Sequence, residues 1–269
     1  MLIKQLIKQV SNSFGYELSK VPNKSTSVKL DDYPCIDLLD LVVQNYTQSH
    51  PDIFFIQIGA HDGVSADPSS RQIRKYENWR GILVEPQSDS FQELLVNYEK
   101  DQDRLIFEQL AVGNQDGSIP FFTVRKDIAD LTFWLPQSAS FDRDHVLGAL
   151  YYWKYVRKLD SIPEDFNTVI EEIQVPTLTM RSLLAKHSVT KVDLFLLATP
   201  GFDFDIIQGF PFDQFKPPLI CFEYNTLQPQ QRQAALKFLA DLGYSVGRFG
   251  SRALAALDVP TLLWTISEY

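Results

Sequence analysis

The amino-acid sequence predicts an α/β protein with a mostly parallel sheet and helices on both faces. Short apolar runs that end at glycine or at charged residues are typical of strands buried on both sides. Segments with a helical rhythm of apolar residues separate these runs. The first strands and helices follow one another closely, and strands that alternate with helices pair in parallel.

The composition is that of a folded globular protein with an acidic surface. The 269 residues are 45% hydrophobic, 13% aromatic and 22% charged, which excludes a disordered chain. The formal net charge of −9 argues against a nucleic-acid partner, because phosphate repels such a surface. Cys35 and Cys221 are too few for a disulfide framework or a four-thiolate zinc site, so we expect reduced thiols and a cytoplasmic location. The histidine spacing predicts no metal site.

The chain divides into a helical leader and linker, residues 1–51, and a main domain, residues 52–269. The leader is predicted to contain an amphipathic helix, a polar linker and a second helix, at residues 2–10, 12–31 and 36–46. We expect the first helix to pack on the domain. The alternative is that Lys4 and Lys8 hold it on an anionic membrane surface.

The main domain begins with a regular alternation of strands and helices. Apolar runs that end near Gly59, Glu85 and Ala111 predict three buried strands, and two helical patterns lie between them. These elements are, in order, strand 53–58, helix 73–79, strand 81–84, helix 90–98 and strand 105–111. A Ser-Asp pair before the second helix can cap its start.

The second half contains an insertion at about residues 126–174, preceded by a turn and a strand at 119–124. The aromatic group at residues 151–155 fits either core packing or a lid that stacks on a sugar ring. The remaining predicted elements are helix 179–186, strand 192–197, helix 203–209, strand 219–223, helix 230–242 and an antiparallel pair of strands at 244–249 and 261–266.

A candidate ligand site follows the first strand, in the run FIQIGAHDG. In open parallel sheets, ligands bind beyond the carboxyl ends of the strands. Glu85 ends the next strand, where a carboxylate can accept hydrogen bonds from both hydroxyls of a ribose. The glycine spacing Gly-x-x-x-Gly differs from that of dinucleotide binders, so it favours a nucleoside cofactor without phosphates, such as S-adenosylmethionine, over a nicotinamide cofactor. The predicted cofactor-binding residues are Ile58, Gly59, Ala60, His61, Asp62, Gly63, Glu85, Pro86, Ala111 and Val112.

Three motifs, FIQIGAHDG, WRGILVEPQ and LAVGNQDGSIPFF, resemble those of the FkbM-type S-adenosylmethionine-dependent methyltransferases. A Ser-Phe-Asp-Arg run in the insertion, at residues 140–143, is similar to a run in the same family. The resemblance covers residues 52–269. It implies a Rossmann-like methyltransferase fold, with a seven-stranded, mostly parallel sheet and an antiparallel last strand. It also implies that the loop from Gly59 to Gly63 and Glu85 bind the methyl donor, and that a hydroxylated small molecule or glycan is O-methylated.

One stretch departs from the family pattern. After the strand at 192–197 the family usually has Lys-x-Asp-x-Glu-Gly, whereas Leu196, Ala198 and Pro200 replace its charged residues here. Alanine can act neither as a base nor as a metal ligand. The substitutes predicted for catalysis are His61, whose ordinary pKa suits proton transfer, together with Glu223 and Asp203. His145 is interpreted as a surface residue of the insertion. The alternative function is a degenerate binding or regulatory module that keeps the fold without turnover.

Overall fold

The computed structural model describes residues 38–65, 69–129, 131–132 and 134–257. Its main sheet has seven strands in the order β3-β2-β1-β7-β8-β10-β9. The strands are β1 (Phe54–Ile58), β2 (Arg80–Val84), β3 (Leu105–Glu108), β7 (Leu194–Leu197), β8 (Leu219–Glu223), β9 (Ser245–Phe249) and β10 (Arg252–Ala256). The first five of these pair in parallel, and the last strand, β10, is antiparallel to both of its neighbours. The predicted fold class is therefore confirmed.

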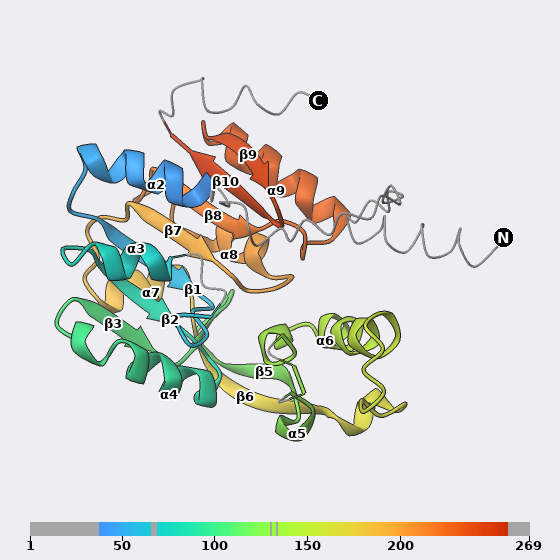
Figure 1. Cartoon of the computed structure of the whole chain (residues 1–269). Helices are drawn as coiled ribbons and strands as arrows, with labels where there is room; N and C mark the ends of the chain where they lie inside the picture. Colours follow the sequence, from blue (N-terminus) through green and yellow to red (C-terminus); the bar gives the residue numbers. More distant parts are fainter. Residues whose placement is uncertain (1–37, 66–68, 130, 133, 258–269) are drawn as a thin grey trace, which may run out of the picture.

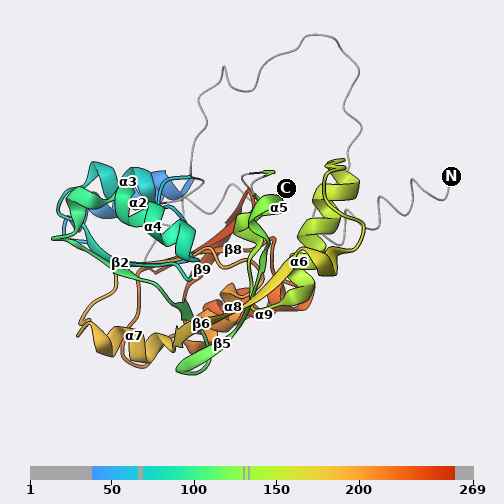
Figure 2. The same cartoon turned by 90° about the horizontal axis from the view of Figure 1, so that it is seen from below.

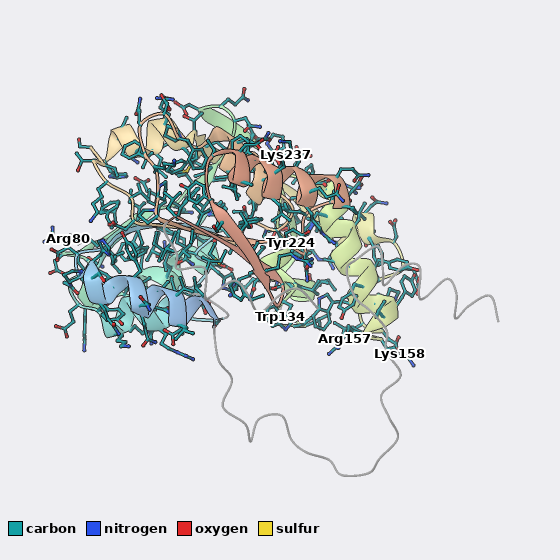
Figure 3. All side chains as sticks on the ribbon, turned by 90° about the horizontal axis from the view of Figure 1, so that it is seen from above. Arg80, Trp134, Arg157, Lys158, Tyr224 and Lys237 are labelled. Carbon is teal, nitrogen blue, oxygen red and sulfur yellow. The ribbon has the colours of Figure 1, made fainter. Side chains whose placement is uncertain are left out.

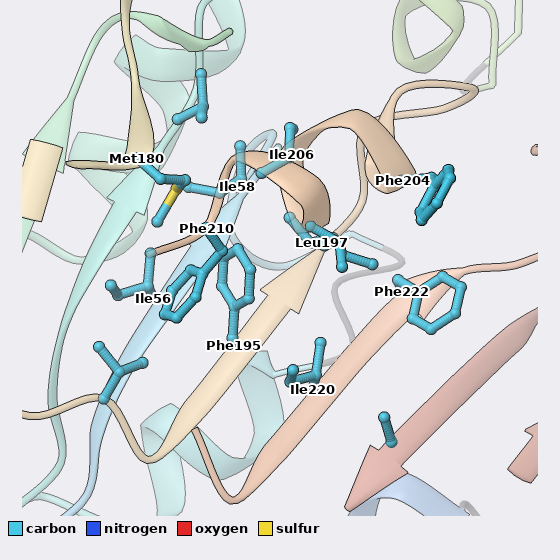
Figure 4. Packing of buried hydrophobic residues seen from close by; sticks show 14 of the residues in the cluster. Ile56, Ile58, Met180, Phe195, Leu197, Phe204, Ile206, Phe210, Ile220 and Phe222 are labelled. Atoms are coloured by element: carbon cyan, nitrogen blue, oxygen red, sulfur yellow. The ribbon is translucent and has the colours of Figure 1, made fainter. Parts of the chain in front are cut away.

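Helices cover both faces of this sheet (Figures 1 and 2). One face carries α2 (Leu38–Ser49), α3 (Ser70–Lys75) and α4 (Ser88–Asn97), and the other carries α7 (Met180–Lys186), α8 (Asp203–Gly209) and α9 (Pro229–Asp241). Strand side chains alternate between the two layers, as the pleat requires. Ile56, Phe195 and Phe222 pack on the α7–α9 side (Figure 4), whereas Phe55 and Leu196 pack on the α2–α4 side.

The register of the central strands brings their carboxyl ends level. Ile58 of β1 lies beside both Val84 of β2 and Leu197 of β7. The loops that follow these strands therefore begin side by side, at the edge where ligands bind in open parallel sheets.

The predicted strand at 105–111 is two strands in two sheets. β3 ends at Glu108, and β4 (Ala111–Val112) pairs instead with β6 (Ile170–Leu178), which pairs in turn with β5 (Gly117–Val124). Figure 1 shows β5 and β6 leaving the main sheet as a twisted arm beside α5 (Lys126–Ala129) and α6 (Arg143–Tyr151). After Glu108 the chain leaves the edge of β2 and continues into the arm. The two parts of the predicted strand therefore belong to different sheets.

The insertion has a small core of its own. Val146 and Leu150 of α6 pack with Val124, Ile128, Leu135, Ile162 and Val169, and the last residues of the range 126–174 belong to β6. A turn of π-helix (Tyr152–Val156) continues α6. Trp153 packs against this core, whereas Tyr151 and Tyr155 are exposed. Figure 3 shows Arg157 and Lys158, just beyond the π-helix, at the outer edge of the molecule.

Two predictions differ from the structure in more than the exact ends of an element. The helix predicted at 73–79 is α3, which ends at Lys75 because Tyr76 has an extended backbone. The Arg104 guanidinium donates hydrogen bonds to the carbonyls of Ile73, at 3.0 Å, and Trp79, at 2.9 Å. β9 pairs with β10, a strand that was not predicted. Residues 261–266 and the leader segments 2–10 and 12–31 lie outside the described residues. Within the part of the chain that the structure describes, no helix is both long and apolar enough to cross a membrane.

Candidate functional site

A cavity of about 400 Å³ lies at the carboxyl ends of β1, β2, β7 and β8. Its volume is in the usual range for small-molecule sites. The main sheet supplies one wall and the arm supplies the other, because β4, β5 and the segment before α6 line the cavity opposite the strand ends. The site is therefore formed between the two sheets.

The loop after β1 is held in shape by its own backbone and by α4. The Asp62 carboxylate accepts hydrogen bonds from the backbone N–H groups of Val64, at 2.9 Å, and Ser65, at 2.7 Å. The Tyr98 hydroxyl donates to the Gly63 carbonyl at 2.7 Å. Burial acts against the Asp62 charge, but these hydrogen bonds outweigh it and lower the pKa of Asp62. These hydrogen bonds define the shape of the loop.

Close contacts within the protein require glycine at two positions of this loop. Gly59 has a φ of +79°, and a Cβ there would collide with the backbone carbonyl of Ala198. Gly63 has a φ of +70°, and a Cβ there would stand 2.5 Å from the Tyr98 ring. The close approach that glycine permits at these two positions is therefore to the β7 loop and to α4.

Glu85 is buried at the floor of the cavity, directly after β2. One carboxylate oxygen accepts the backbone N–H of His61, and the other accepts that of Gln87, both at 2.9 Å. Burial raises the pKa of Glu85, and the two N–H donors act in the opposite direction. Each oxygen can accept a second hydrogen bond, so the carboxylate is placed to receive a pair of ligand hydroxyls.

Most of the predicted cofactor residues meet at this cavity. Those that line it are Ile58, Gly59, Ala60, His61, Glu85, Pro86, Ala111 and Val112. Asp62 and Gly63 do not line it and instead support the loop from behind.

The stretch that departs from the family pattern is uncharged where it meets the cavity. Ala198 and Pro200 line it, whereas the Leu196 side chain is buried in the core on the α2–α4 side. A charged side chain at position 196 would need solvation or a partner inside that core. The leucine is thus explained by packing.

Asp203 does not lie on the cavity. Its fully buried carboxylate accepts hydrogen bonds from the backbone N–H of Thr199, at 2.8 Å, from the Thr199 hydroxyl, and from the backbone N–H of Glu223, at 2.7 Å. Burial raises the pKa of Asp203 to about 7. This geometry makes Asp203 a positioning residue for the β7 and β8 strand ends, in place of the catalytic contact that the sequence predicts.

Glu223 and His61 both reach the cavity. Glu223 Oε1 accepts a hydrogen bond from Arg252 Nε at 2.7 Å, across the β8–β10 pair. His61 has a φ of +48°, and its Nδ1 lies 3.5 Å from the Asp62 carboxylate. Among the described residues, no group of three or more His, Cys, Asp or Glu side chains could hold a metal ion.

Several lining residues were not predicted. His145 of α6 lies against Gly201, and the rings of Phe121, Phe141 and Phe202 form an aromatic wall. Phe141 lies 5.2 Å from Phe121 and 5.0 Å from Phe202 between ring centroids, with edge-to-face packing. The Ser-Phe-Asp-Arg run at 140–143 was the available signal. The aromatic residues at 151–155, considered as a lid, do not line the cavity.

The fold and this site define a Rossmann-like protein with a ligand cavity at the carboxyl edge of its sheet. A sequence model of the methyltransferase FkbM domain matches residues 57–246. The chain belongs to the FkbM methyltransferase family. No curated protein matches it in sequence.

Solved structures of methyltransferases are similar to the chain at low sequence identity. The methyltransferase FkbM from Methylobacillus flagellatus KT is 11% identical, with a TM-score of 0.46, over 77% of this chain and 43% of that one. The chain thus spans less than half the length of that protein. The precorrin-6y C5,15-methyltransferase from Geobacter metallireducens GS-15 is 12% identical, with a TM-score of 0.39, over 84% and 95% of the two chains. A human methyltransferase 10 domain containing protein is 10% identical, with a TM-score of 0.38, over 93% and 92%.

Proposed function

We propose that the protein is an S-adenosylmethionine-dependent O-methyltransferase that acts on a hydroxyl of a small molecule or glycan. The observation that carries the proposal is Glu85, a buried carboxylate at the end of β2 that faces the cavity beside the loop after β1. Ribose presents two neighbouring hydroxyls, and a carboxylate accepts both in one geometry. Family membership supports the same chemistry.

The residues present fit a nucleoside cofactor without phosphates. Glu85 would hold the ribose, and the backbone of Gly59 to His61 would lie along the donor. Ala111 and Val112 offer an apolar surface of the kind that suits an adenine ring. Once bound, S-adenosylmethionine would supply an electrophilic methyl group. The chain's own part is to orient the acceptor, exclude water and receive a proton.

A binding module without turnover is the second candidate. It is favoured by Ala198 and Pro200, which leave the β7 loop without the acids of the family pattern, and by the engagement of Glu223 with Arg252. In this function the fold and the cofactor site would be retained for regulation.

Two measurements test the proposal. Calorimetric titration with S-adenosylmethionine should show one site, and formation of S-adenosylhomocysteine over a panel of cyclic diols and pyranosides should reveal turnover. Binding without turnover over the whole panel would favour the module. In that case activity gained only in the double variant Ala198→Asp, Pro200→Glu would trace the loss to the β7 loop. Absence of binding would overturn both functions.

A further inference from the structure

His145 lies at the cavity opposite the strand ends. It is the third residue of α6, whose start is capped by Asp142 through a hydrogen bond from the Asp144 N–H at 2.9 Å. The imidazole Nδ1 would be 3.3 Å from a Cβ at Gly201, so the ring rests on the loop that also carries Ala198 and Pro200. The insertion thus brings a titratable group to the loop after β7, where Ala198 and Pro200 carry no charge.

The other titratable groups on the cavity have engagements of their own. Besides His145, four titratable residues of the described chain line it: His61, Glu85, Glu223 and Arg252. Glu85 receives two backbone N–H groups, and Glu223 and Arg252 bond each other. His61 belongs to the loop predicted to hold the cofactor, and its own N–H is bonded to Glu85.

The surroundings of His145 favour the neutral ring. Burial lowers the pKa of His145, and Asp142 acts in the opposite direction. The N-terminal end of a helix carries partial positive charge, which also disfavours an imidazolium. The charged groups on the facing elements are Glu223 and Arg252, which neutralise each other. A neutral imidazole has a ring nitrogen free to accept a proton at neutral pH.

We propose that His145 is the catalytic base that takes the proton from the acceptor hydroxyl, a role that rests on the proposed function. In the reaction the acceptor oxygen gains the methyl carbon, and the donor's carbon–sulfur bond breaks with its electron pair left on sulfur. The hydroxyl proton passes to the imidazole and then to solvent, so atoms and charge balance. His145 of the insertion therefore takes the role of the acidic residue that the family pattern has at position 198, where this chain has alanine.

The acceptor class follows from the wall beside His145. Phe121, Phe141 and Phe202 present ring faces and edges and no charge. Aromatic walls suit the apolar face of a cyclic molecule, while hydroxyls on its rim can reach a base. The acceptor is thus expected to be a neutral ring that carries hydroxyls.

The first test compares His145→Gln with His50→Gln, the same change at an exposed residue whose ring stacks on Tyr46. His145→Gln should keep S-adenosylmethionine affinity within about twofold. Its kcat on the best panel acceptor should fall by about 10²-fold or more, with the KM little changed, because a general base contributes about that much. The acidic limb of the pH profile should disappear. His50→Gln should match the wild type.

The second test needs no turnover. Histidine ring signals, assigned with His145→Gln and His61→Gln, are followed by NMR in the presence of S-adenosylhomocysteine. The His145 signal should titrate below pH 6.5 and shift when cyclohexane-1,2-diol is added. A midpoint above about 7, no response to the diol, or full kcat in His145→Gln would overturn the role of His145. Loss of kcat in His61→Gln alone would do the same. Failure of S-adenosylhomocysteine to bind the wild type would instead overturn the proposed function.

Discussion

Glu85 has a structural role as well as the proposed binding role, because its two carboxylate oxygens accept hydrogen bonds from the loops after β1 and β2. The change Glu85→Gln would place an amide NH₂ against one of two backbone N–H donors and remove a charge. We expect S-adenosylmethionine affinity to fall at least about tenfold, since a hydrogen bond to a charged group contributes about 1.5–3 kcal/mol. Calorimetric titration measures the change.

The matched control is Glu93→Gln, an exposed position on α4. Its affinity should equal that of the wild type. If Glu85→Gln binds as tightly as Glu93→Gln while remaining folded by circular dichroism, the ribose contact assigned to Glu85 is wrong.

Gly63 tests whether the loop after β1 is fixed by packing. Gly63→Ala puts a methyl group against Leu94 and Tyr98 at a φ of +70°, so overpacking and backbone strain add. We expect the free energy of unfolding to fall by about 1–3 kcal/mol. Gly148→Ala in α6 meets no atom within 4 Å and should raise it by about 0.5–1 kcal/mol. Equal effects in denaturant titrations would contradict the packing argument.

At the scale of elements, Asp203 joins the turn between β7 and α8 to the end of β8. Its folded pKa, about 7, lies above the ordinary value of 3.8. A raised acid pKa stabilises the fold fully below about pH 4, and this contribution is lost as the pH rises through 7. We therefore expect the free energy of unfolding contributed by Asp203 to decrease between pH 4 and pH 7.

Asp203→Asn isolates this contribution because asparagine does not titrate. Its NH₂ group would face a backbone N–H of Thr199 or Glu223, so the variant should be less stable than the wild type at pH 5. The difference in free energy of unfolding should shrink by pH 8. A difference that stays constant over this range would show that burial does not raise the pKa of the Asp203 carboxyl.

Local sequence patterns predict the strands that have a clear run of apolar residues. β1, β2, β7 and β8 are found almost where their sequences place them. β10 was not predicted, because its run Arg-Ala-Leu-Ala-Ala has weak strand propensity and becomes a strand by insertion between β8 and β9. The break between β3 and β4 also depends on pairing with a distant strand, which no local pattern encodes.

At the scale of the whole molecule, the cavity lies between the two sheets, so a ligand bound there would contact residues of both. A ligand that binds only the folded form stabilises it by about 2.7 kcal/mol at a concentration 100 times its Kd. For a chain of this size we expect S-adenosylhomocysteine to raise the Tm by roughly 5–10 °C. Thermal scans of the wild type and of Glu85→Gln at one ligand concentration measure this. An equal rise in the variant would place the ligand elsewhere.

Sequence patterns could predict only those parts of the site that directly follow a recognisable strand. Gly59 and Glu85 follow strands in one stretch of chain, so their meeting is implied by parallel pairing. His145 and Arg252 meet them through the placement of α6 and of β10, which depends on long-range packing. His145 was therefore interpreted as a surface residue.

The departure of the chain from the main sheet between Glu108 and Ala111 has a consequence for how such proteins diversify. The segment from β5 to the start of β6 forms one continuous cassette, and Gly59 and Glu85, which are proposed to bind the donor, lie outside it. Grafting this cassette between relatives should transfer acceptor choice while leaving the donor half intact. Specificity in this fold would then evolve by replacing one wall of the cavity.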